Sequence, residues 1–118
     1  MTAKDVIEAL SALAHEHRLR IYRLLVEQGP IGLPAGQVAS KVGLVPSSLT
    51  FHLQALQRAG LIRQRRESRR LIYRADFASM DALVGYLTEN CCMNSGECLP
   101  SCKPGRPARA TKRTGTAG

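Results

Sequence analysis

The segment between residues 46 and 75 constrains the fold of this chain most, because a helix pattern is followed at once by a hairpin pattern. Its first residue, a proline, suits the first turn of a helix, and Gly60 suits the position just after a helix end. Between them, leucines recur at the i, i+4 and i+7 spacing of one buried helix face, namely Leu49, Leu53 and Leu56. Residues 61–75 then indicate two short strands around a turn near Glu67 and Ser68. A two-stranded hairpin is only marginally stable alone, so we expect it to pack against helices.

Four other segments show the periodicity of amphipathic helices, at about residues 4–14, 17–28, 35–42 and 76–90. Residues 29–34, "GPIGLP", contain two glycines and two prolines and are predicted to form a loop. The predicted order is therefore helix, helix, helix-turn-helix, hairpin and helix. This order is that of a winged helix-turn-helix, a mainly α fold with a small β hairpin, which we expect over residues 1–90.

The positive charge of the chain is concentrated in the same middle segment. The chain of 118 residues has a formal net charge of +8, and residues 46–75 hold seven arginines against one glutamate. Residues 76–102 hold four carboxylates and no lysine or arginine. A clustered basic patch is typical of a nucleic-acid binder, whereas the alternative is a merely solvated face. We therefore expect a nucleic acid as a partner.

Short polar side chains dominate the exposed half of the helix that starts at residue 46. Such groups donate and accept hydrogen bonds without bulk, as a helix that enters a DNA major groove requires. The candidates for contacts to base edges are Ser47, Ser48, Thr50 and Gln54. The alternative is an N-cap with a solvated surface, and we expect at least one of the serines to cap the helix. For His52 we predict a phosphate contact, with packing or capping as the alternative.

The arginines around the predicted hairpin turn are candidates for contacts to phosphate or to a minor groove. They are Arg65, Arg66, Arg69 and Arg70. Loss of one should weaken binding to every DNA sequence and reduce its salt dependence. Residues 103–118 are Pro, Gly, Ala, Thr and basic residues without apolar periodicity, so we predict a disordered basic tail there.

Other classes of protein are disfavoured by what the sequence lacks. No nucleophile–base pair, phosphate-binding glycine loop or paired carboxylates occur, so we expect no enzyme. No apolar stretch reaches the ~18 residues of a membrane span, and the first residues do not resemble a secretory signal. We therefore expect a cytoplasmic protein without a membrane partner.

All four cysteines of the chain follow the last predicted helix within twelve residues, as Cys91, Cys92, Cys98 and Cys102. A disulfide framework is disfavoured by the expected reducing compartment. A structural zinc site usually uses cysteine pairs separated by two to four residues, and adjacent cysteines fit it poorly. Trivalent arsenic fits better, because it is a soft centre whose three pyramidal positions three thiolates can fill. Residues 91–102 are therefore predicted to form a cysteine-rich segment that binds such a soft centre.

Residues 5–92 resemble the ArsR/SmtB family of metal-responsive repressors. The resemblance rests on "LAHEHRLRIYRLL", "SSLTFHLQALQRAGLI" and "RRESRRLIYR". The second stretch matches the family pattern at Thr50, His52-Leu53, Leu56 and Ala59-Gly60-Leu61. "TENCC" resembles an arsenite-responsive subgroup more narrowly. One departure lies in the hairpin turn, where relatives often have Gly and this chain has Ser68.

The resemblance implies a homodimer that pairs through its first and last helices and represses an arsenic-resistance operon. It implies release from double-stranded operator DNA when As(III), or antimony, binds the cysteines, and no cofactor is expected to be permanently bound. The implied ligands are Cys91, Cys92 and Cys98, with Cys102 as an alternative third ligand. Zinc sites that other members build on the last helix are not expected, because that helix has no His. A regulator that responds to thiol oxidation, or to a divalent soft metal such as zinc or cadmium, is the alternative.

Overall fold

The structure is a computed structural model that describes residues 1–93. It divides into two units, Met1–Leu83 and Val84–Gly118, and each is described by itself. The predictions for Cys98, Cys102 and the basic tail lie outside the described residues.

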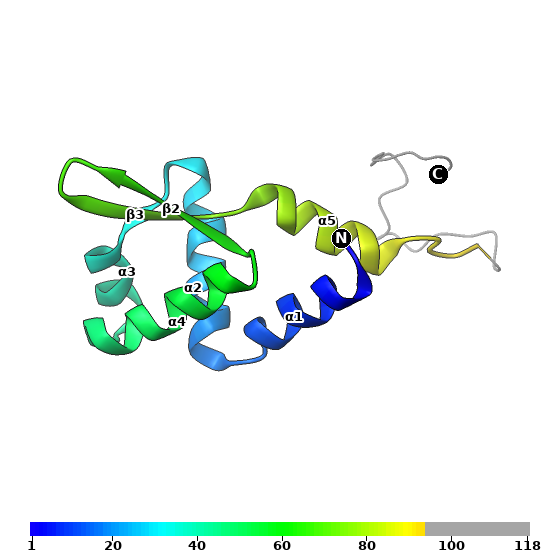
Figure 1. The fold of residues 1–118 in the computed structure, drawn as a ribbon, viewed down its shortest axis with the longest axis horizontal. Coiled ribbons are helices and arrows are strands. Elements are labelled where there is room, and N and C mark those ends of the chain that lie inside the picture. Colours follow the sequence, from blue (N-terminus) through cyan, green and yellow to red (C-terminus); the bar gives the residue numbers. More distant parts are fainter. Residues whose placement is uncertain (94–118) are drawn as a thin grey trace. The chain divides into compact units, whose positions relative to one another are not determined.

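The predicted winged helix-turn-helix is confirmed as a mainly helical fold with a small antiparallel sheet (Figure 1). Its helices are α1 (Ala3–Leu13), α2 (Glu16–Gln28), α3 (Ala35–Val42), α4 (Pro46–Arg58) and α5 (Phe77–Thr88), with a 3₁₀ turn, η1, over Gly29–Ile31. Its strands are β1 (Leu33–Pro34), β2 (Ile62–Glu67) and β3 (Arg70–Ala75). Among the described residues, no helix is long and apolar enough to cross a membrane.

Local residues set several of these helix ends. Thr2 and Asp5 form a capping box at the start of α1, in which the Asp5 amide donates to Thr2 Oγ1 at 3.1 Å and the Thr2 amide donates to Asp5 Oδ2 at 3.0 Å. α3 ends at Gly43, which adopts a left-handed conformation with a φ of 75°. At the start of α5, the Ser79 amide donates to Asp76 Oδ1 at 3.1 Å. These caps explain where α1 and α5 begin and where α3 ends.

The sheet has the strand order β1-β3-β2, so the predicted hairpin gains a third strand from the predicted loop. The loop prediction was wrong at Leu33 and Pro34, because two residues are too few to show strand periodicity. Gly32 makes this pairing possible, since a Cβ atom there would collide with the carbonyl oxygen of Tyr73. At the hairpin turn, Ser68 adopts a φ of 58° although it is not a glycine.

The core is aliphatic and centres on α4. Leu49, Leu53 and Leu56 are at most 2% exposed, which confirms the predicted inward stripe. α1 is different, because its buried residues are Val6, Ala9 and Ala12. Leu10, which shares the helical spacing of Val6, is 42% exposed, and Ile7 is 62% exposed. α1 therefore presents apolar side chains to the surface as well as to the core.

Candidate nucleic-acid interface and cysteine segment

The first turn of α4 has no side-chain cap. Its cap position is Val45, and Pro46 is the first helical residue, so Ser47 and Ser48 already lie inside the helix. The prediction that one of these serines caps the helix was therefore wrong. The first amides of a helix lack acceptors within the helix, and together with the helix dipole they suit an anion such as phosphate. The start of α4 thus presents backbone donors that no side chain of the described residues accepts.

The residues predicted to contact bases lie on the side of α4 away from its buried leucines. Ser47, Thr50 and Gln54 are exposed, and Ser48 is half-buried. Thr50 Oγ1 donates to the carbonyl oxygen of Pro46 at 3.0 Å, so its proton is used inside the helix while its oxygen can still accept a hydrogen bond. Their position at the surface agrees with base contacts, and the contacts themselves stay a prediction.

His52 lies inside the protein and not on this polar surface. It is 7% exposed, and its Nδ1 accepts a hydrogen bond from Arg18 Nε at 3.1 Å. The rings of His15 and His17 lie 4.8 and 5.7 Å from its ring, measured between centroids. Burial lowers the pKa of His52 below its usual value, and the nearby His15 and Arg18 lower it further. The structure therefore favours the packing role of His52 over the predicted phosphate contact.

The four predicted hairpin arginines divide into two pairs. Arg65 Nη2 donates to the carbonyl oxygen of Ile31 at 3.0 Å and lies 3.4 Å from Glu67 Oε2, while Arg70 Nη2 lies 3.7 Å from Glu67 Oε1. Arg66 and Arg69 are exposed and make no hydrogen bond or ion pair with any described residue. The second pair therefore has its full hydrogen-bonding capacity available for a partner.

Arg63, which the sequence analysis did not single out, has a structural contact. Its Nε donates to Asp76 Oδ2 at 2.8 Å, and the carboxylate is 12% exposed. Burial raises the pKa of Asp76, but the bond from Arg63 and the amides of Ser79 and Ala78 outweigh it, so the pKa lies below its usual value. Arg63 thus ties β2 to the start of α5.

The start of α4 and the turn of the β2–β3 hairpin lie at the same end of the Met1–Leu83 unit, on the left in Figure 1. Uncapped helix amides, exposed hydroxyls and two unpaired arginines are therefore presented toward one side. This arrangement can contact the phosphate backbone and the base edges of a nucleic acid at the same time.

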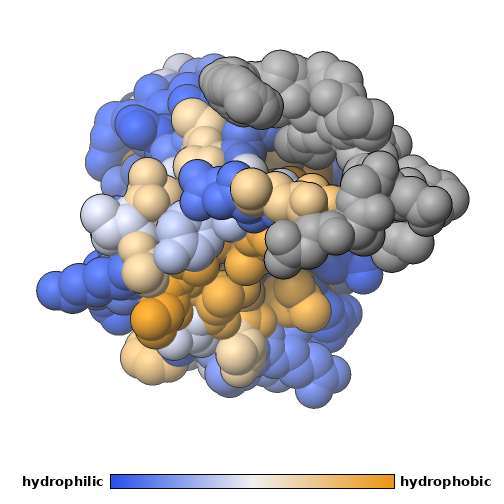
Figure 2. All heavy atoms as spheres, turned by 90° about the vertical axis from the view of Figure 1, so that its right-hand side faces the viewer, coloured by the Kyte–Doolittle hydropathy of each residue, from blue (hydrophilic) through white to orange (hydrophobic). Residues whose placement is uncertain are grey.

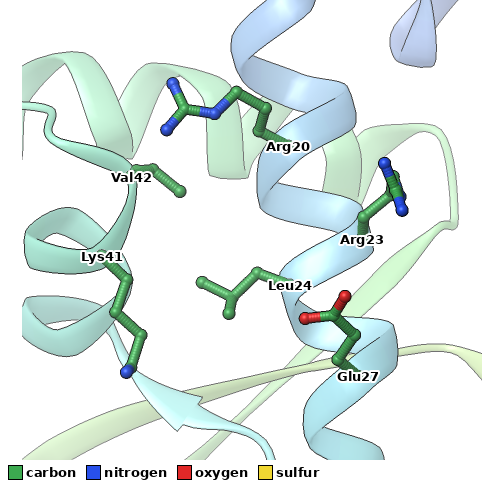
Figure 3. Close-up of a pocket in the computed structure, with 6 residues that line it drawn as sticks. All are labelled: Arg20, Arg23, Leu24, Glu27, Lys41 and Val42. Atoms are coloured by element: carbon green, nitrogen blue, oxygen red, sulfur yellow. The ribbon is translucent and has the colours of Figure 1, made fainter.

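A second basic surface lies between α2 and α3, where a pocket of about 240 Å³ opens to solvent. Figure 3 shows its lining, with Arg20, Arg23, Leu24 and Glu27 on α2, and Lys41 and Val42 on α3. Three of the four charged residues are cations, which favours an anion there. The sequence analysis missed this surface, because its charges are spread over two helices and form no run in the sequence.

The cysteine segment begins directly after α5. Cys91 Sγ and Cys92 Sγ lie 3.2 Å apart, and Cys92 adopts a left-handed φ of 65°. The third predicted ligand, Cys98, and the alternative, Cys102, lie outside the described residues. Within residues 1–93, no group of three His, Cys, Asp or Glu side chains is arranged to hold a metal ion. The described residues thus bring together two sulfur atoms of the predicted set.

Comparison with known proteins connects this geometry to a family. Residues 13–65 match a family described as a helix-turn-helix domain. The transcriptional activator HlyU of Vibrio cholerae is 33% identical over 86 residues, which cover 73% of this chain and 76% of HlyU. This chain belongs to the winged helix-turn-helix transcriptional regulators. A second such regulator, YgaV of Escherichia coli, is 29% identical over 77% of this chain and 90% of its own. Both relatives are named as regulators and not as enzymes, as the sequence predicts.

Solved structures of similar regulators extend the comparison. The homodimeric winged helix-turn-helix DNA-binding domain Mb0332 of Mycobacterium bovis, described as a possible ArsR-family regulator, has a TM-score of 0.59 and is 30% identical. The match covers 81% of this chain and 89% of Mb0332. An ArsR-like transcriptional regulator from Rhodococcus sp. RHA1 has a TM-score of 0.62 at 27% identity, over 71% of this chain and 76% of its own. ArsR-type regulators are thus among the structural neighbours of this regulator.

Proposed function

We propose that this regulator is a homodimeric, DNA-binding repressor of an arsenic-resistance operon, and that trivalent arsenic releases it from its operator. The observation that carries the DNA-binding part is the uncapped start of α4 on the same side as the hairpin turn. The amides of Ser47 and Ser48 would bind a phosphate, while Arg66 and Arg69 would bind the backbone beside it. The exposed hydroxyls and the amide of Gln54 would then meet base edges in the major groove.

The homodimer is supported by apolar side chains at the surface of α1. Ile7 and Leu10 are 62% and 42% exposed, although both occur in a helix that already buries another face. Figure 2 views the side of the molecule that includes the start of α1, and apolar side chains gather there. A second copy would cover such a surface and place two α4 helices on DNA, with half-sites about 34 Å apart or at a multiple of this distance. Mb0332, at 30% identity, is homodimeric.

Arsenic binding is supported by the adjacent sulfur atoms of Cys91 and Cys92, 3.2 Å apart. Two thiolates at this separation can bind one soft centre, and Cys98 would supply the third. Each As–S bond would replace an As–OH bond of arsenite, and the displaced hydroxide would take up the thiol proton and leave as water. Cys91 and Cys92 follow α5 closely, and α5 is one of the two proposed dimer helices. Arsenic binding at its end would therefore alter the dimer interface.

The required coupling is moderate. To change operator occupancy from 99:1 to 1:99, the inducer must bind the released state with a preference of about 5.5 kcal/mol. A dimer has two cysteine segments, so each bound atom would contribute about half of this preference. The segments need no contact with DNA for this, since only the differential affinity for the two states matters.

The test is a titration of arsenite into a complex of the full chain with a fluorescent duplex selected from a random-sequence library. We expect dissociation of the complex by arsenite, and no dissociation with a Cys91→Ser, Cys92→Ser double variant. Met93→Ser, at an exposed neighbour of the pair that carries no thiol, serves as the matched control and should respond like the wild type. A wild-type complex that stays intact in arsenite would contradict the inducer, whereas a chain that selects no duplex would contradict the DNA-binding function.

The same two sulfur atoms also favour a second candidate, a regulator that responds to oxidation. Two thiols 3.2 Å apart are close enough to react with one another after one of them is oxidised. Release of DNA by peroxide but not by arsenite, reversed by a dithiol reductant, would select this function. Release by zinc or cadmium alone would select a response to a divalent soft metal.

A further inference from the structure

We infer that Phe51 is a specificity-determining residue, and that its ring contacts the 5-methyl group of a thymine in each half-site. This inference rests on the proposed DNA-binding function and adds a base contact to it that hydrogen-bonding residues cannot supply. The observation behind it is a large aromatic side chain, 58% exposed, on the polar side of α4.

The position of Phe51 on α4 places it among the candidate base-reading residues. Residues three and four apart lie next to each other on a helix surface. Phe51 therefore neighbours Ser47 and Ser48 toward the start of α4, and Gln54 toward its end. Any duplex that meets these polar side chains also meets the phenyl ring.

The ring is held by two neighbours that limit its motion. The guanidinium carbon of Arg18 lies 5.5 Å from the ring centroid, as in a cation–π contact. The ring of His52 lies 5.5 Å away at an interplanar angle of 66°, close to an edge-on arrangement. The same Arg18 donates to His52, so one side chain positions both rings. Phe51 is thus anchored at its base while most of its surface stays open to a partner.

The chemistry of the ring selects thymine among the four bases. In the major groove, a phenyl ring can neither donate nor accept a strong hydrogen bond. The thymine 5-methyl is the one apolar group that the four bases display in that groove, and apolar side chains are its usual protein contacts. Contact between the Phe51 ring and this methyl group would remove both the methyl group and part of the exposed ring from water.

Uracil interference tests this directly, because deoxyuridine lacks only the methyl group of thymidine. The full chain first selects duplexes from a random-sequence library. The selected duplexes are then prepared with scattered deoxyuridine, and the bound and unbound fractions are cleaved at uracil and sequenced. We expect wild-type binding to decrease about fourfold for each half-site in which one thymine is replaced, the effect of losing one buried methyl-sized group. The sensitive thymines should occupy symmetric positions in the two half-sites.

Two substitutions then assign the sensitive thymine to the ring. Phe51→Ala should bind the unmodified duplex more weakly and lose the interference at these thymines, while Phe51→Leu should retain part of it. Leu19→Ala, a change at an exposed leucine of α2, should leave the pattern unchanged. Because Phe51 is exposed, thermal melting should show that Phe51→Ala still folds.

Identical interference patterns for the wild type and Phe51→Ala would overturn the inference while the DNA-binding function stands. A wild-type pattern without any sensitive thymine would overturn it in the same way. Failure of the wild type to select any duplex would instead overturn the proposed function, and this inference with it.

Discussion

α4 and α5 both have a helical apolar pattern, but the protein covers them differently. α4 has 13 residues, and its stripe of Leu49, Leu53 and Leu56 is at most 2% exposed. α5 has 12 residues, and Leu83 is its buried residue. Tyr86 and Leu87, in the second unit, are 40% and 58% exposed. Within the described residues, the apolar face of α4 is thus buried by its own chain, whereas that of α5 stays partly exposed.

A periodic apolar pattern predicts that one face of a helix is buried, because each buried apolar side chain contributes free energy in proportion to its area. The pattern does not predict whether the same chain or a second molecule buries that face. For α4 the cover is the core of the first unit, and for the exposed face of α1 we propose a second copy of the chain.

The largest effect is expected in the core of the first unit. Leu53→Ala should lower the free energy of unfolding by about 2–5 kcal/mol, because it removes a buried side chain and leaves a cavity. Leu87→Ala should lower it less, because this side chain is 58% exposed in the single chain and only a second copy would cover it. Urea unfolding of both variants at the same protein concentration measures this. Equal losses would show that α5 is covered as completely as α4.

The apolar face of α1 gives the next largest effect. Leu10→Asp should shift the protein from dimer to monomer, because a carboxylate buried in an apolar interface has no partner. DNA affinity should decrease by about tenfold or more, since a monomer contacts one half-site. Sedimentation velocity and DNA titration measure the two results.

Leu19→Asp is the matched control for this prediction. Leu19 is 44% exposed, close to the 42% of Leu10, but lies on α2. If the two substitutions shifted the protein to monomer equally, the α1 face would not be the dimer interface.

Most of the fold could be predicted from the sequence, because its helices repeat an apolar spacing and end at strong local signals. The helices predicted over residues 35–42 and from Pro46 to just before Gly60 match α3 and α4 closely, since Gly43 and Pro46 mark their limits. β1 could not be predicted, because it depends on the backbone of Gly32 fitting against Tyr73, far away in the sequence. The pattern therefore identifies elements, while the pairing of short segments requires the tertiary structure.

The candidate site was predicted less completely for the same reason. The exposed polar face of α4 follows from its leucine spacing, so Ser47, Thr50 and Gln54 were placed correctly at the surface. The burial of His52 depends on Arg18 and His15, which lie more than thirty positions earlier. No local sequence pattern indicates that these two residues lie next to His52. The same spacing also places Phe51 away from the buried face, but the prediction selected polar side chains for base contacts, and the contact of Phe51 with Arg18 is tertiary.

The contrast between Arg66, which has no side-chain partner among the described residues, and Arg63, which has one, predicts a smaller effect, on salt dependence. Arg66→Ala should reduce the slope of log affinity against log salt by about 0.9 for each half-site, because one phosphate contact is lost. Arg63→Ala should leave this slope unchanged and instead reduce stability, since Arg63 is bonded to Asp76 at 2.8 Å. Fluorescence titrations across a salt series, with parallel melting curves, separate the two effects. A changed slope for Arg63→Ala with unchanged melting would reverse the two assignments.

The smallest expected effect concerns pH and the buried face of α4. The pKa of His52 lies below its usual value of 6.5, first because of burial and then because of His15, Arg18 and His17 around it. The unfolded chain therefore binds the proton first as the pH decreases. The stability that neutral His52 provides is complete above pH 6.5 and is lost as the pH falls from 6.5 toward the folded-state pKa.

His52→Gln tests this assignment, because it keeps a polar side chain that does not titrate. The wild type should lose stability as the pH falls below 6.5, and the variant should lose less over the same interval. Asp76 does not confuse the result, because its pKa lies below 3.8, so its contribution is lost only in more acidic solution. Urea unfolding at half-unit pH steps measures the difference. If the free energy of unfolding depended on pH in the same way for both proteins, groups other than His52 would cause the acid sensitivity. The contact between Arg18 and His52 would then have no role in it.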